Sequence, residues 1–572
     1  MKKRKFLLCA GAVLMAFAAA SQAQVYTGTA QGKKGPVAVE VTLEGGAIRS
    51  VRVTSQHESP GISDPAIAAV PAAIVKHQSL NVEAVSGATV TSNAIIAAVA
   101  DALSKSGSGL SRYRAAPKAA SGRAAAAHET VSADVVVLGT GAAGLAAADT
   151  AAVKGARRVL VLEKQGVLGG STGLSSGCVL RATDGRDADN SFSPDTMFRY
   201  IMGRSNGKAY APMVRKIADM SNGTYHWIKD LGVKFTSFKP VYPGYPALRL
   251  ENPDPEGKFA RTSGMYIVKA LHQDALRHHV VFRMQTPAQS LIYKNGKVTG
   301  VIARTPGGGR LTVNARSVVI ATGGFNRDPD LQRQYAGPTV GLPDETSHGN
   351  TGDGHKMAMA VGADTVFQGG KGTMLSVRAD ATAGIPKNFL YVDGRGRRFV
   401  NEAGFYDDIG KAMVLNDSKR YFRVYDSSED TAGLEKAARE GRALKASTLE
   451  ELADRMRIDR KAFRRTVERY NNLPSDVDFG KPDKLLTGVR KAPFYAIHAE
   501  PEIVASFGGL KTDENARVLN RNGAPIAGLY AAGEVANGIL YDDCYAYTGV
   551  SIQSSLSTGR IAGEEAAKGL LR

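Results

Sequence analysis

Cysteine is scarce in this chain of 572 residues, which contains only three: Cys9, Cys178 and Cys544. Because Cys9 lies in a segment that we expect to be removed, at most one disulfide can form, and no disulfide framework holds the fold. The sequence has no C-x-x-C-H motif, which excludes a covalently attached c-type haem. It also has no cluster of Cys and His with metal-ligand spacing, so we predict no metal site.

Long apolar runs are also rare, and only residues 6–20 form one. This run follows four basic residues and ends in small residues around Ala23, which is the pattern of a secretory signal peptide. The run is too short to span a membrane comfortably. We therefore expect residues 1–23 to be removed and the remaining protein to be soluble in the periplasm.

Acidic residues are outnumbered, with 54 against 73 Lys and Arg, which gives a formal net charge of +19. An exported protein rarely meets nucleic acid, so we predict no such partner. We interpret the excess as a basic, solvated surface that can attract an acidic redox partner.

Residues 24–104 have the patterns of a small α+β unit. Polar and apolar residues alternate over residues 37–55 around a Glu-Gly-Gly turn, which predicts a β-hairpin. Residues 65–79 and 92–106 have the composition of helices. Residues 105–131 are rich in Ala, Gly, Ser and basic residues, which is typical of a flexible linker.

The rest of the chain has the pattern of one nucleotide-binding domain with an insertion. From Ala133 the sequence predicts a strand, a Gly-rich turn, a helix and a second strand. The alternation of strand and helix signals weakens near residue 364. Helix signals follow, including the capping-box spacing from Ser447 to Glu450. Gly-rich signals return near residue 505. We therefore assign residues 132–363 and 505–572 to one domain and residues 364–504 to the insertion.

A dinucleotide fingerprint opens this domain. Gly139, Gly141 and Gly144 fit G-x-G-x-x-G between a predicted strand and helix, and Glu163 ends the next strand. The three glycines permit a tight turn, a close approach of backbone to a pyrophosphate, and close helix–strand packing. An acid about twenty residues further on is placed to bind ribose hydroxyls. A purely structural Gly turn is the alternative.

Several further motifs follow in a fixed order: "GGST" (169–172), "ATGGF" (321–325), "TGDG" (351–354), "RRFVNE" (397–402) and "GLYAAGE" (528–534). This set resembles the FAD domain of the fumarate reductase and succinate dehydrogenase flavoprotein superfamily. The resemblance implies a multidomain α/β and α+β protein, in which a Rossmann-like FAD domain is interrupted by an α+β clamp (capping) domain. It also implies that non-covalent FAD is bound by Gly139, Gly141, Ala143, Gly144, Glu163, Lys164, Gly170, Ser171, Thr172, Gly323, Asp353, Glu534, Ser551 and Ile552.

The stretch "SGATVTS" (residues 86–92) has two interpretations. The simpler one is a helix N-cap made by its hydroxyls. However, S-G-A-T, together with "HESPGI" (57–62) and Gln78, resembles the FMN-binding domain of sodium-pumping quinone reductase and Rnf-type subunits. That resemblance implies that a flavin transferase joins FMN to Thr89 through a phosphoester, with Thr91 as the reserve acceptor. Glu83 stands where that family usually has Asp.

Two flavins in one exported chain imply an electron relay, in the layout of urocanate reductase. The only strong dinucleotide fingerprint is already assigned to FAD, so we expect no NAD(P)H-binding module. Electrons would come from a membrane-associated quinol-oxidising protein or a cytochrome and pass through FMN and FAD. The acceptor would be the activated C=C bond of a small, enoate-like organic molecule.

The carboxylate-binding residues of the fumarate reductases are missing from this chain. Alignment on the motifs places Tyr406 at the position where the fumarate reductases have the proton-donor Arg. It places Ala505 at the position of the His that binds the substrate carboxylate, and Tyr547 near the position of the C-terminal Arg that does the same. The proton-relay pair falls near Thr382 and Ile385, which are not ionisable. Because Arg holds a carboxylate by bidentate, charge-assisted bonds, this loss argues against fumarate and makes urocanate a poor candidate.

Tyrosines take the place of these residues. We predict catalytic roles for Tyr406, as the proton donor, and for Tyr547, since tyrosines act as acids and bases in the similar 3-ketosteroid dehydrogenases. Tyr541 and Tyr545 could line the pocket, and for every one of these tyrosines simple aromatic packing is the alternative. Two other functions stay open: a dehydrogenase that works in the oxidative direction, and an electron carrier without an organic substrate.

Overall fold

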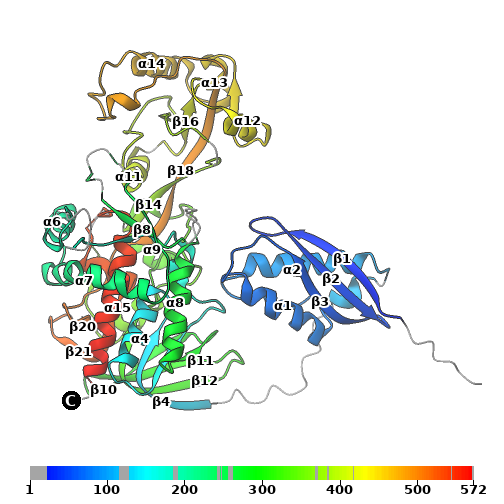
Figure 1. Cartoon of the computed structure of the whole chain (residues 1–572), viewed down its shortest axis with the longest axis vertical. Helices are drawn as coiled ribbons and strands as arrows, with labels where there is room; N and C mark the ends of the chain where they lie inside the picture. The colour runs from blue at the N-terminus through cyan, green and yellow to red at the C-terminus, as the bar shows by residue number, and fades with distance from the viewer. Residues whose placement is uncertain are drawn as a thin grey trace, which may run out of the picture. The chain divides into compact units, whose positions relative to one another are not determined.

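The computed structural model describes residues 22–107, 109–114, 128–184, 191–240, 242, 245–246, 248–254, 262–367, 372–382, 385–416, 418–542 and 544–569. The chain divides into two compact units, residues 1–122 and 123–572 (Figure 1). The expected signal peptide, except its last two residues, and most of the expected linker lie outside the described residues. Within the described ranges, no helix combines the length and apolar character that crossing a membrane requires.

The first unit is a three-stranded antiparallel sheet with helices packed on it. Val37, Val39 and Val41 alternate with more exposed residues and supply the buried face of the central strand. The hairpin turns through Gly45 and Gly46, both at positive φ, a conformation that glycine adopts without steric cost. The predicted hairpin and both predicted helices are confirmed; the first strand was missed. The elements are β1(Gln24–Gln31), β2(Pro36–Glu44), β3(Ala47–Ser55), α1(Asp64–His77), α2(Thr89–Ser104) and α3(Ser111–Arg114).

The second unit is built on an eight-stranded sheet with the order β10-β11-β21-β12-β4-β5-β9, and β20 pairs with β21. The strands β21, β12, β4, β5 and β9 run parallel to their neighbours in this order. The last four residues of β4 and all of β5 are buried apolar runs, as expected of parallel strands covered on both faces. The strands are β4(His128–Leu138), β5(Val159–Leu162), β9(Val281–Arg283), β10(Ala288–Lys294), β11(Lys297–Arg304), β12(Arg310–Ile320), β20(Arg517–Leu519) and β21(Pro525–Ala531).

Helices and small sheets surround this sheet. The helices are α4(Ala142–Val153), α5(Gly170–Leu174), α6(Pro194–Arg204), α7(Ala211–Asp230), α8(Gly264–Arg277), α9(Pro329–Tyr335), α10(Asp353–Met359) and α15(Val550–Lys568). The remaining short strands are β6(Val179–Leu180), β7(Thr236–Phe238), β8(Leu250–Asn252), β13(Thr365–Val366) and β19(Gly509–Leu510).

The C-terminal helix α15 packs on α4, the helix of the glycine fingerprint (Figure 1). Gly559 and Gly563 make this approach possible. A Cβ atom at these positions would lie 2.4 Å from the carbonyl oxygen of Ala143 and 2.3 Å from that of Ala147. Since the obstacle is backbone rather than a flexible side chain, the contact specifically requires glycine on α15.

Two glycine-to-alanine changes in helix interiors should therefore have opposite effects on stability. Gly563→Ala is expected to lower the free energy of unfolding by about 1–3 kcal/mol, because the methyl group overpacks the α4–α15 contact. Gly223→Ala, in α7 with open space around its Cβ position, should raise it by about 0.5–1 kcal/mol. Urea unfolding of the full chain measures both. Stabilisation by Gly563→Ala would contradict the packing argument.

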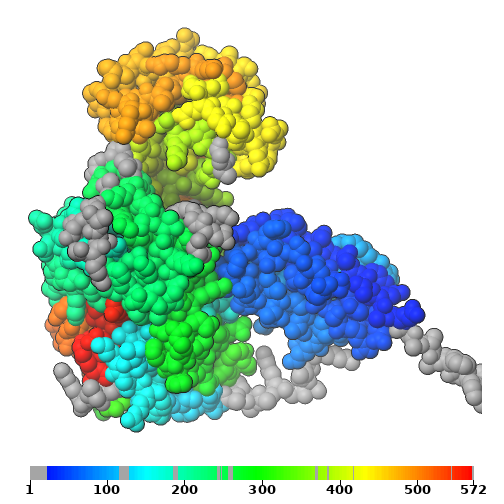
Figure 2. Space-filling view, viewed as in Figure 1, coloured from blue at the N-terminus to red at the C-terminus, as the bar shows by residue number. Residues whose placement is uncertain are grey.

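The insertion forms a lobe of its own within the second unit, coloured from yellow-green to orange in Figure 2. Its sheet has the order β14-β18-β16-β15, and β17 pairs with β18. The sequence placed a capping box at Ser447 and Glu450, but it lies one residue later: Glu451 N–H donates to Thr448 Oγ1 and Ser447 N–H to Glu451 Oε2. The elements are β14(Thr373–Ala379), β15(Leu390–Asp393), α11(Tyr406–Asn416), β16(Tyr421–Tyr425), α12(Ala432–Arg439), β17(Leu444–Ala446), α13(Leu449–Met456), α14(Arg460–Asn471) and β18(Phe494–Ser506).

The "RRFVNE" motif has a structural role in this lobe. Arg398 makes two hydrogen bonds each to Glu402 and Asp476, at 2.7–2.8 Å, and all three side chains are almost fully buried. Lys481 lies 3.5 Å from Glu402. A fully paired buried cluster of this kind tolerates no missing member. It therefore fixes the segment that leads directly into α11 and its first residue, Tyr406.

Candidate active site

A cavity of about 500 Å³ lies at the carboxyl ends of the parallel strands and reaches the insertion. Leu138 and Leu162, the last residues of β4 and β5, line it, as do Ala321 and Ala532 just beyond β12 and β21. This edge is where ligands bind in open α/β sheets. The insertion contributes Tyr406 and other residues to the opposite wall.

The three fingerprint glycines have different places. Gly139 has φ 107°, and its Cβ would lie 2.4 Å from Ala321 O. Gly144 is a packing residue, since its Cβ would lie 2.1 Å from Gly139 O, and it is not part of the cavity wall. Gly141 has its nearest neighbour atom at 3.7 Å from the Cβ position and faces the cavity, so backbone is exposed there to a ligand at the N-terminus of α4.

Glu163 is held at the end of β5 by three donors. Its carboxylate accepts from Thr140 N at 3.0 Å, Thr140 Oγ1 at 2.7 Å and Gln165 N at 2.8 Å. Burial raises the pKa of this carboxyl despite these bonds. A buried carboxylate with remaining lone pairs is suited to accept hydrogen bonds from ribose hydroxyls.

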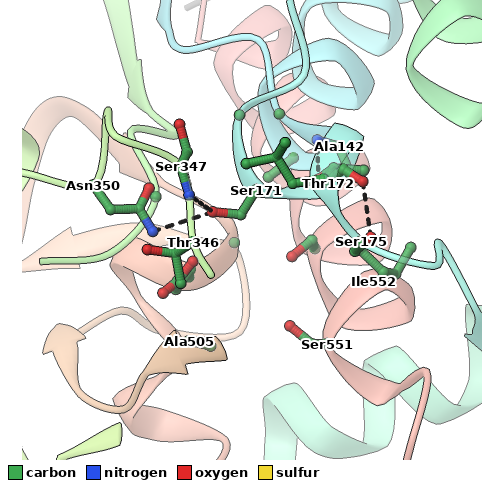
Figure 3. Close-up of a pocket in the computed structure, with 18 of the residues that line it drawn as sticks. Ala142, Ser171, Thr172, Ser175, Thr346, Ser347, Asn350, Ala505, Ser551 and Ile552 are labelled. Carbon is green, nitrogen blue, oxygen red and sulfur yellow. Dashed lines mark hydrogen bonds between the residues drawn. The ribbon is translucent and has the colours of Figure 1, made fainter. Parts of the chain in front are cut away.

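The hydroxyl of Ser171 joins two segments across the cavity. Figure 3 shows Ser347 and Asn350 pointing toward it, and Ser171 Oγ accepts from Ser347 N at 3.1 Å and Asn350 Nδ2 at 3.2 Å. On the same helix, Thr172 Oγ1 accepts from Ala142 N at 3.1 Å. These bonds fix "GGST" against the fingerprint turn.

Three further acids line the cavity: Glu345, Asp353 and Glu534. Asp353 pairs with Lys164 at 2.6 Å. Glu534 accepts from Ser506 N at 2.7 Å and Ser506 Oγ at 3.0 Å, and burial raises its pKa to about 7. Lys164 is the only basic residue among the described residues that line the cavity, and it is already paired.

The described residues fit FAD in two respects. First, Thr346 lines the cavity, and its buried Oγ1 has no hydrogen-bond partner within the described part of the chain. Because an unpaired buried hydroxyl lowers stability, this atom is suited to bind a ligand. The glycine at 141 leaves open space where a side chain would block a phosphate. The structure brings the following predicted cofactor residues to the cavity wall: Gly139, Gly141, Ala143, Glu163, Lys164, Gly170, Ser171, Thr172, Gly323, Asp353, Glu534, Ser551 and Ile552.

On the side of the insertion the described lining residues carry no charge except Glu345, whose N–H donates to Ile503 O at 3.0 Å. We call this set the uncharged wall: Phe238, Tyr242, Met374, Ser376, Tyr406, Val504, Ala505, Tyr545 and Thr548. Ala505 lies where the fumarate reductases were expected to have a substrate His. Thr382, at the expected relay position, is exposed, and Ile385 packs in a separate apolar cluster.

Tyr406 and Tyr545 present hydroxyls to this cavity. Tyr406 Oη accepts from Thr548 Oγ1 at 3.2 Å, and burial raises its pKa well above the ordinary value. Tyr545 Oη accepts from Ser551 N at 2.9 Å, in the first turn of α15, and burial raises its pKa as well. Because each oxygen accepts a bond, each hydroxyl proton is free to face a ligand.

The position of Tyr547 corrects its predicted catalytic role. Its side chain has 0% exposure, stacks on Phe405 at 5.9 Å, and donates to Pro240 O at 3.2 Å. It is not among the residues of the wall, because its ring is enclosed by packing. Tyr541 is also outside the wall and pairs with Ser554 Oγ at 3.2 Å. Sequence reasoning missed Tyr242, which belongs to no motif, and did not assign a role to Thr548, although this residue lies directly after Tyr547.

Cys178 and Cys544 are not joined in a disulfide. Cys178 lines the cavity, and burial raises its pKa to about 11. The thiol therefore stays protonated near neutral pH and is a weak nucleophile.

His355 lies on α10 between two residues of the cavity wall, with 0% exposure. Neither ring nitrogen has a hydrogen-bond partner within the described residues, and burial lowers its pKa to about 4. Since the unfolded chain binds this proton near pH 6.5, the folded state is favoured above pH 6.5 and loses stability as the pH falls toward 4.

Replacing His355 by Leu should flatten this pH dependence. Between pH 7.5 and 5, the loss of unfolding free energy is expected to be about 2 kcal/mol smaller in His355→Leu than in the wild type. Urea unfolding at the two pH values measures the difference. An equal loss in both proteins would show that His355 is not buried in the neutral form.

In the first unit, α2 begins at Thr89, and its N-cap residue, Ala88, makes no side-chain hydrogen bond. The simpler interpretation of "SGATVTS" as a hydroxyl N-cap is therefore wrong. Thr89 is exposed, whereas Thr91 is 5% exposed and donates its hydroxyl to Glu58. Of the two candidate acceptors, only Thr89 presents its side chain to solvent.

Comparison with known proteins identifies a flavin-binding domain in each unit of the chain. The FAD binding domain family matches residues 134–552, and the FMN-binding domain family matches residues 32–104. Urocanate reductase from Eggerthella lenta is 30% identical over 97% of this chain and 94% of its own length. An NADH:acrylate oxidoreductase from Vibrio harveyi is 29% identical over 95% of this chain, which spans 61% of that longer protein.

Among solved structures, 3-ketosteroid-Δ4-(5α)-dehydrogenase from Rhodococcus jostii, in complex with 4-androstene-3,17-dione, has a TM-score of 0.65 and 27% identity. The match covers 76% of this chain and 97% of that one. The extent of these similarities, together with the paired flavin domains, shows that the chain belongs to the flavoprotein family of the fumarate and urocanate reductases and is a flavin-dependent oxidoreductase acting on CH–CH bonds.

Proposed function

We propose that the protein is an exported reductase that passes electrons through FMN on Thr89 and FAD in the cavity to the activated C=C bond of a weakly charged or uncharged organic acceptor, and not to fumarate. The uncharged wall is the observation that carries this proposal. Among the described residues that line the cavity, the only cation is Lys164, which pairs with Asp353 at 2.6 Å.

The energetics of desolvation support this choice of substrate. Each carboxylate that enters the cavity loses its water shell, and the desolvation free energy is not offset unless a cation or several hydrogen-bond donors bind the carboxylate. Fumarate would bring two carboxylates against Ala505, Met374 and aromatic rings. A ketone, ester or phenol conjugated to the double bond has a small desolvation cost, and a tyrosine hydroxyl can donate to its oxygen.

Tyr406 is the proposed proton donor. The FAD residues described above would hold the cofactor, which, when bound, supplies a hydride to one carbon of the double bond. Tyr406 Oη gives its proton to the neighbouring carbon and regains a proton from water after the product leaves. Its raised pKa keeps the hydroxyl protonated until that transfer, and Thr548 holds the ring oxygen by a hydrogen bond at 3.2 Å.

The first unit would receive the electrons. With FAD as co-substrate of a flavin transferase, the Thr89 oxygen forms a bond to the FMN phosphorus, the bond to the AMP half breaks, AMP leaves, and the hydroxyl proton is released. The α2 N-terminus, free of a side-chain cap, can donate to the phosphate. The residues before Ala23 support export, and a quinol-oxidising membrane protein or a cytochrome is the proposed electron source.

Matched pairs of acceptors test the substrate class. Anaerobic oxidation of reduced methyl viologen by the purified, flavin-loaded protein is measured with two pairs, cinnamate against methyl cinnamate and fumarate against dimethyl fumarate. 4-Phenyl-3-buten-2-one is added as a further uncharged acceptor and urocanate as a further acid. Turnover is expected with the uncharged member of each pair and not with fumarate. Preference for the acids, or turnover with fumarate, would refute the proposal.

A dehydrogenase working in the oxidative direction is the second candidate. It is favoured by the similarity to a 3-ketosteroid dehydrogenase together with the tyrosines Tyr406 and Tyr545 in the wall. If the reductase assay is silent with both flavins bound, reduction of a dye by saturated ketones would support this direction. An electron carrier without an organic substrate would show no turnover in either assay. Such a carrier needs no substrate-binding surface, so the uncharged wall argues against it.

A further inference from the structure

Glu58 joins three segments of the first unit at a single buried carboxylate. It follows β3 in the loop before α1 and is only 5% exposed. Its Oε1 accepts from Lys34 N at 2.9 Å, in the turn between β1 and β2. Its Oε2 accepts from Thr91 Oγ1 at 2.5 Å, in the first turn of α2. The carboxylate thus ties the start of α2 to the sheet.

The surrounding backbone is shaped around this carboxylate. A Cβ atom at Gly32 would lie 2.7 Å from Glu58 Oε1 and 3.0 Å from Gly35 O, so a side chain at this position would displace the carboxylate. On the other side, Ser92 Oγ accepts from Val85 N at 3.0 Å and donates to Ala88 O at 2.9 Å. The side chain of Ser92 therefore holds the segment before Thr89 at both Val85 and Ala88.

We infer that Glu58 is a positioning residue for covalent attachment of flavin to Thr89. Residues two positions apart on a helix point to nearly opposite sides. By drawing Thr91 inward, Glu58 turns the hydroxyl of Thr89 outward to the transferase, and it also occupies the hydroxyl of Thr91. This inference rests on the attachment at Thr89 that we propose above.

Variants of Thr91 test the inference with little change of shape. Thr91→Val removes the hydroxyl that Glu58 holds, and Thr91→Ser keeps it. The full-length protein, purified without covalent flavin, is incubated with FAD, Mg²⁺ and purified flavin transferase. The rate of covalent labelling is followed by flavin fluorescence of the denatured chain, and the labelled residue is identified by mass spectrometry of its peptide.

Thr91→Val is expected to slow the labelling of Thr89 by about tenfold or more, because a charge-assisted bond that orients the acceptor is lost. Thr91→Ser should be labelled at nearly the wild-type rate. Glu58→Ala should slow labelling too, and the double variant Glu58→Ala/Thr91→Val should be no slower than the slower single variant, since both remove one contact. Rates are compared well below the thermal midpoint of each variant, so that a loss of fold is not mistaken for a loss of positioning.

The outcomes separate the inference from the proposal on which it rests. Labelling of Thr91→Val at the wild-type rate, with Thr89 labelled in both proteins, would overturn the role of Glu58 and leave the attachment site intact. Failure of the wild-type protein to be labelled at Thr89 would instead overturn the attachment itself. If Thr91→Val does not fold, Glu58→Asp, which shortens the carboxylate by one carbon, provides the same test.

Discussion

Replacing Thr89 by Val is expected to abolish covalent flavin in the first unit. Valine has nearly the same shape but no oxygen to form the phosphoester, and Thr91 cannot substitute because its hydroxyl is buried and bound to Glu58. Covalent flavin, measured by fluorescence of the denatured protein after coexpression with a transferase, should fall from about one per chain to none. Turnover driven by a quinol-oxidising membrane protein or a cytochrome should fall with it, by about 10²-fold or more, because a relay cofactor is missing.

Two controls make this result specific. Thr89→Ser keeps a hydroxyl at the first position of α2 and should retain covalent flavin. FAD released from the second unit by denaturation should be unchanged in Thr89→Val, since its predicted binding residues lie in another unit. Covalent flavin that persists in Thr89→Val, at Thr91 or elsewhere, would show that the acceptor is wrongly assigned.

The nucleotide-binding part of the fold could be predicted because its signals are local. The fingerprint needs a strand, three glycines and an acid at fixed spacing, and every one of these is a short-range steric or hydrogen-bonding requirement. Gly139 and Gly144 are each forced by a backbone oxygen within 2.4 Å of a Cβ position. The hairpin around Gly45 and Gly46 was predictable for the same reason.

The substrate wall could be predicted only in part. Tyr406 follows a fixed distance after "RRFVNE", and the buried Arg398–Glu402–Asp476 cluster holds that spacing in the structure. In contrast, the described residues of 541–549 form no helix or strand, so alignment could not tell which tyrosine faces the cavity. Tyr545 does and Tyr547 does not. Tyr242 comes from a distant loop, and only tertiary packing brings it to the wall.

The capping box shows a second limit of sequence patterns. Both Ser447/Glu450 and Thr448/Glu451 satisfy the spacing, and the structure uses the latter pair. Apolar residues at Leu452, Ala453 and Met456 must face the core of the lobe. Packing of that face selects the register of α13, and the cap follows from it.

Replacing Tyr406 by Phe is expected to lower turnover by about 10²–10⁴-fold, the range for loss of a general acid, while leaving FAD binding intact. The ring and its packing remain, and only the hydroxyl that faces the cavity is lost. Because burial raises the pKa of Tyr406, the acid stays protonated in alkaline solution. Wild-type kcat should therefore show no loss from pH 7 to 9 through ionisation of this group.

Tyr547→Phe is the matched control, because Tyr547 donates to Pro240 O outside the wall. It should change turnover by less than about tenfold, with its main effect on stability. The turnover of Thr548→Val, which removes the bond to Tyr406 Oη, should lie between those of the two tyrosine variants, because the acid is still present but is less well oriented.

Single-turnover oxidation of the reduced enzyme by its acceptor separates the chemical step from substrate binding. If Tyr406→Phe kept the wild-type rate in that assay and Tyr547→Phe lost it, the proton donor would be the enclosed tyrosine, which would require the packed cluster around Phe405 to open during turnover.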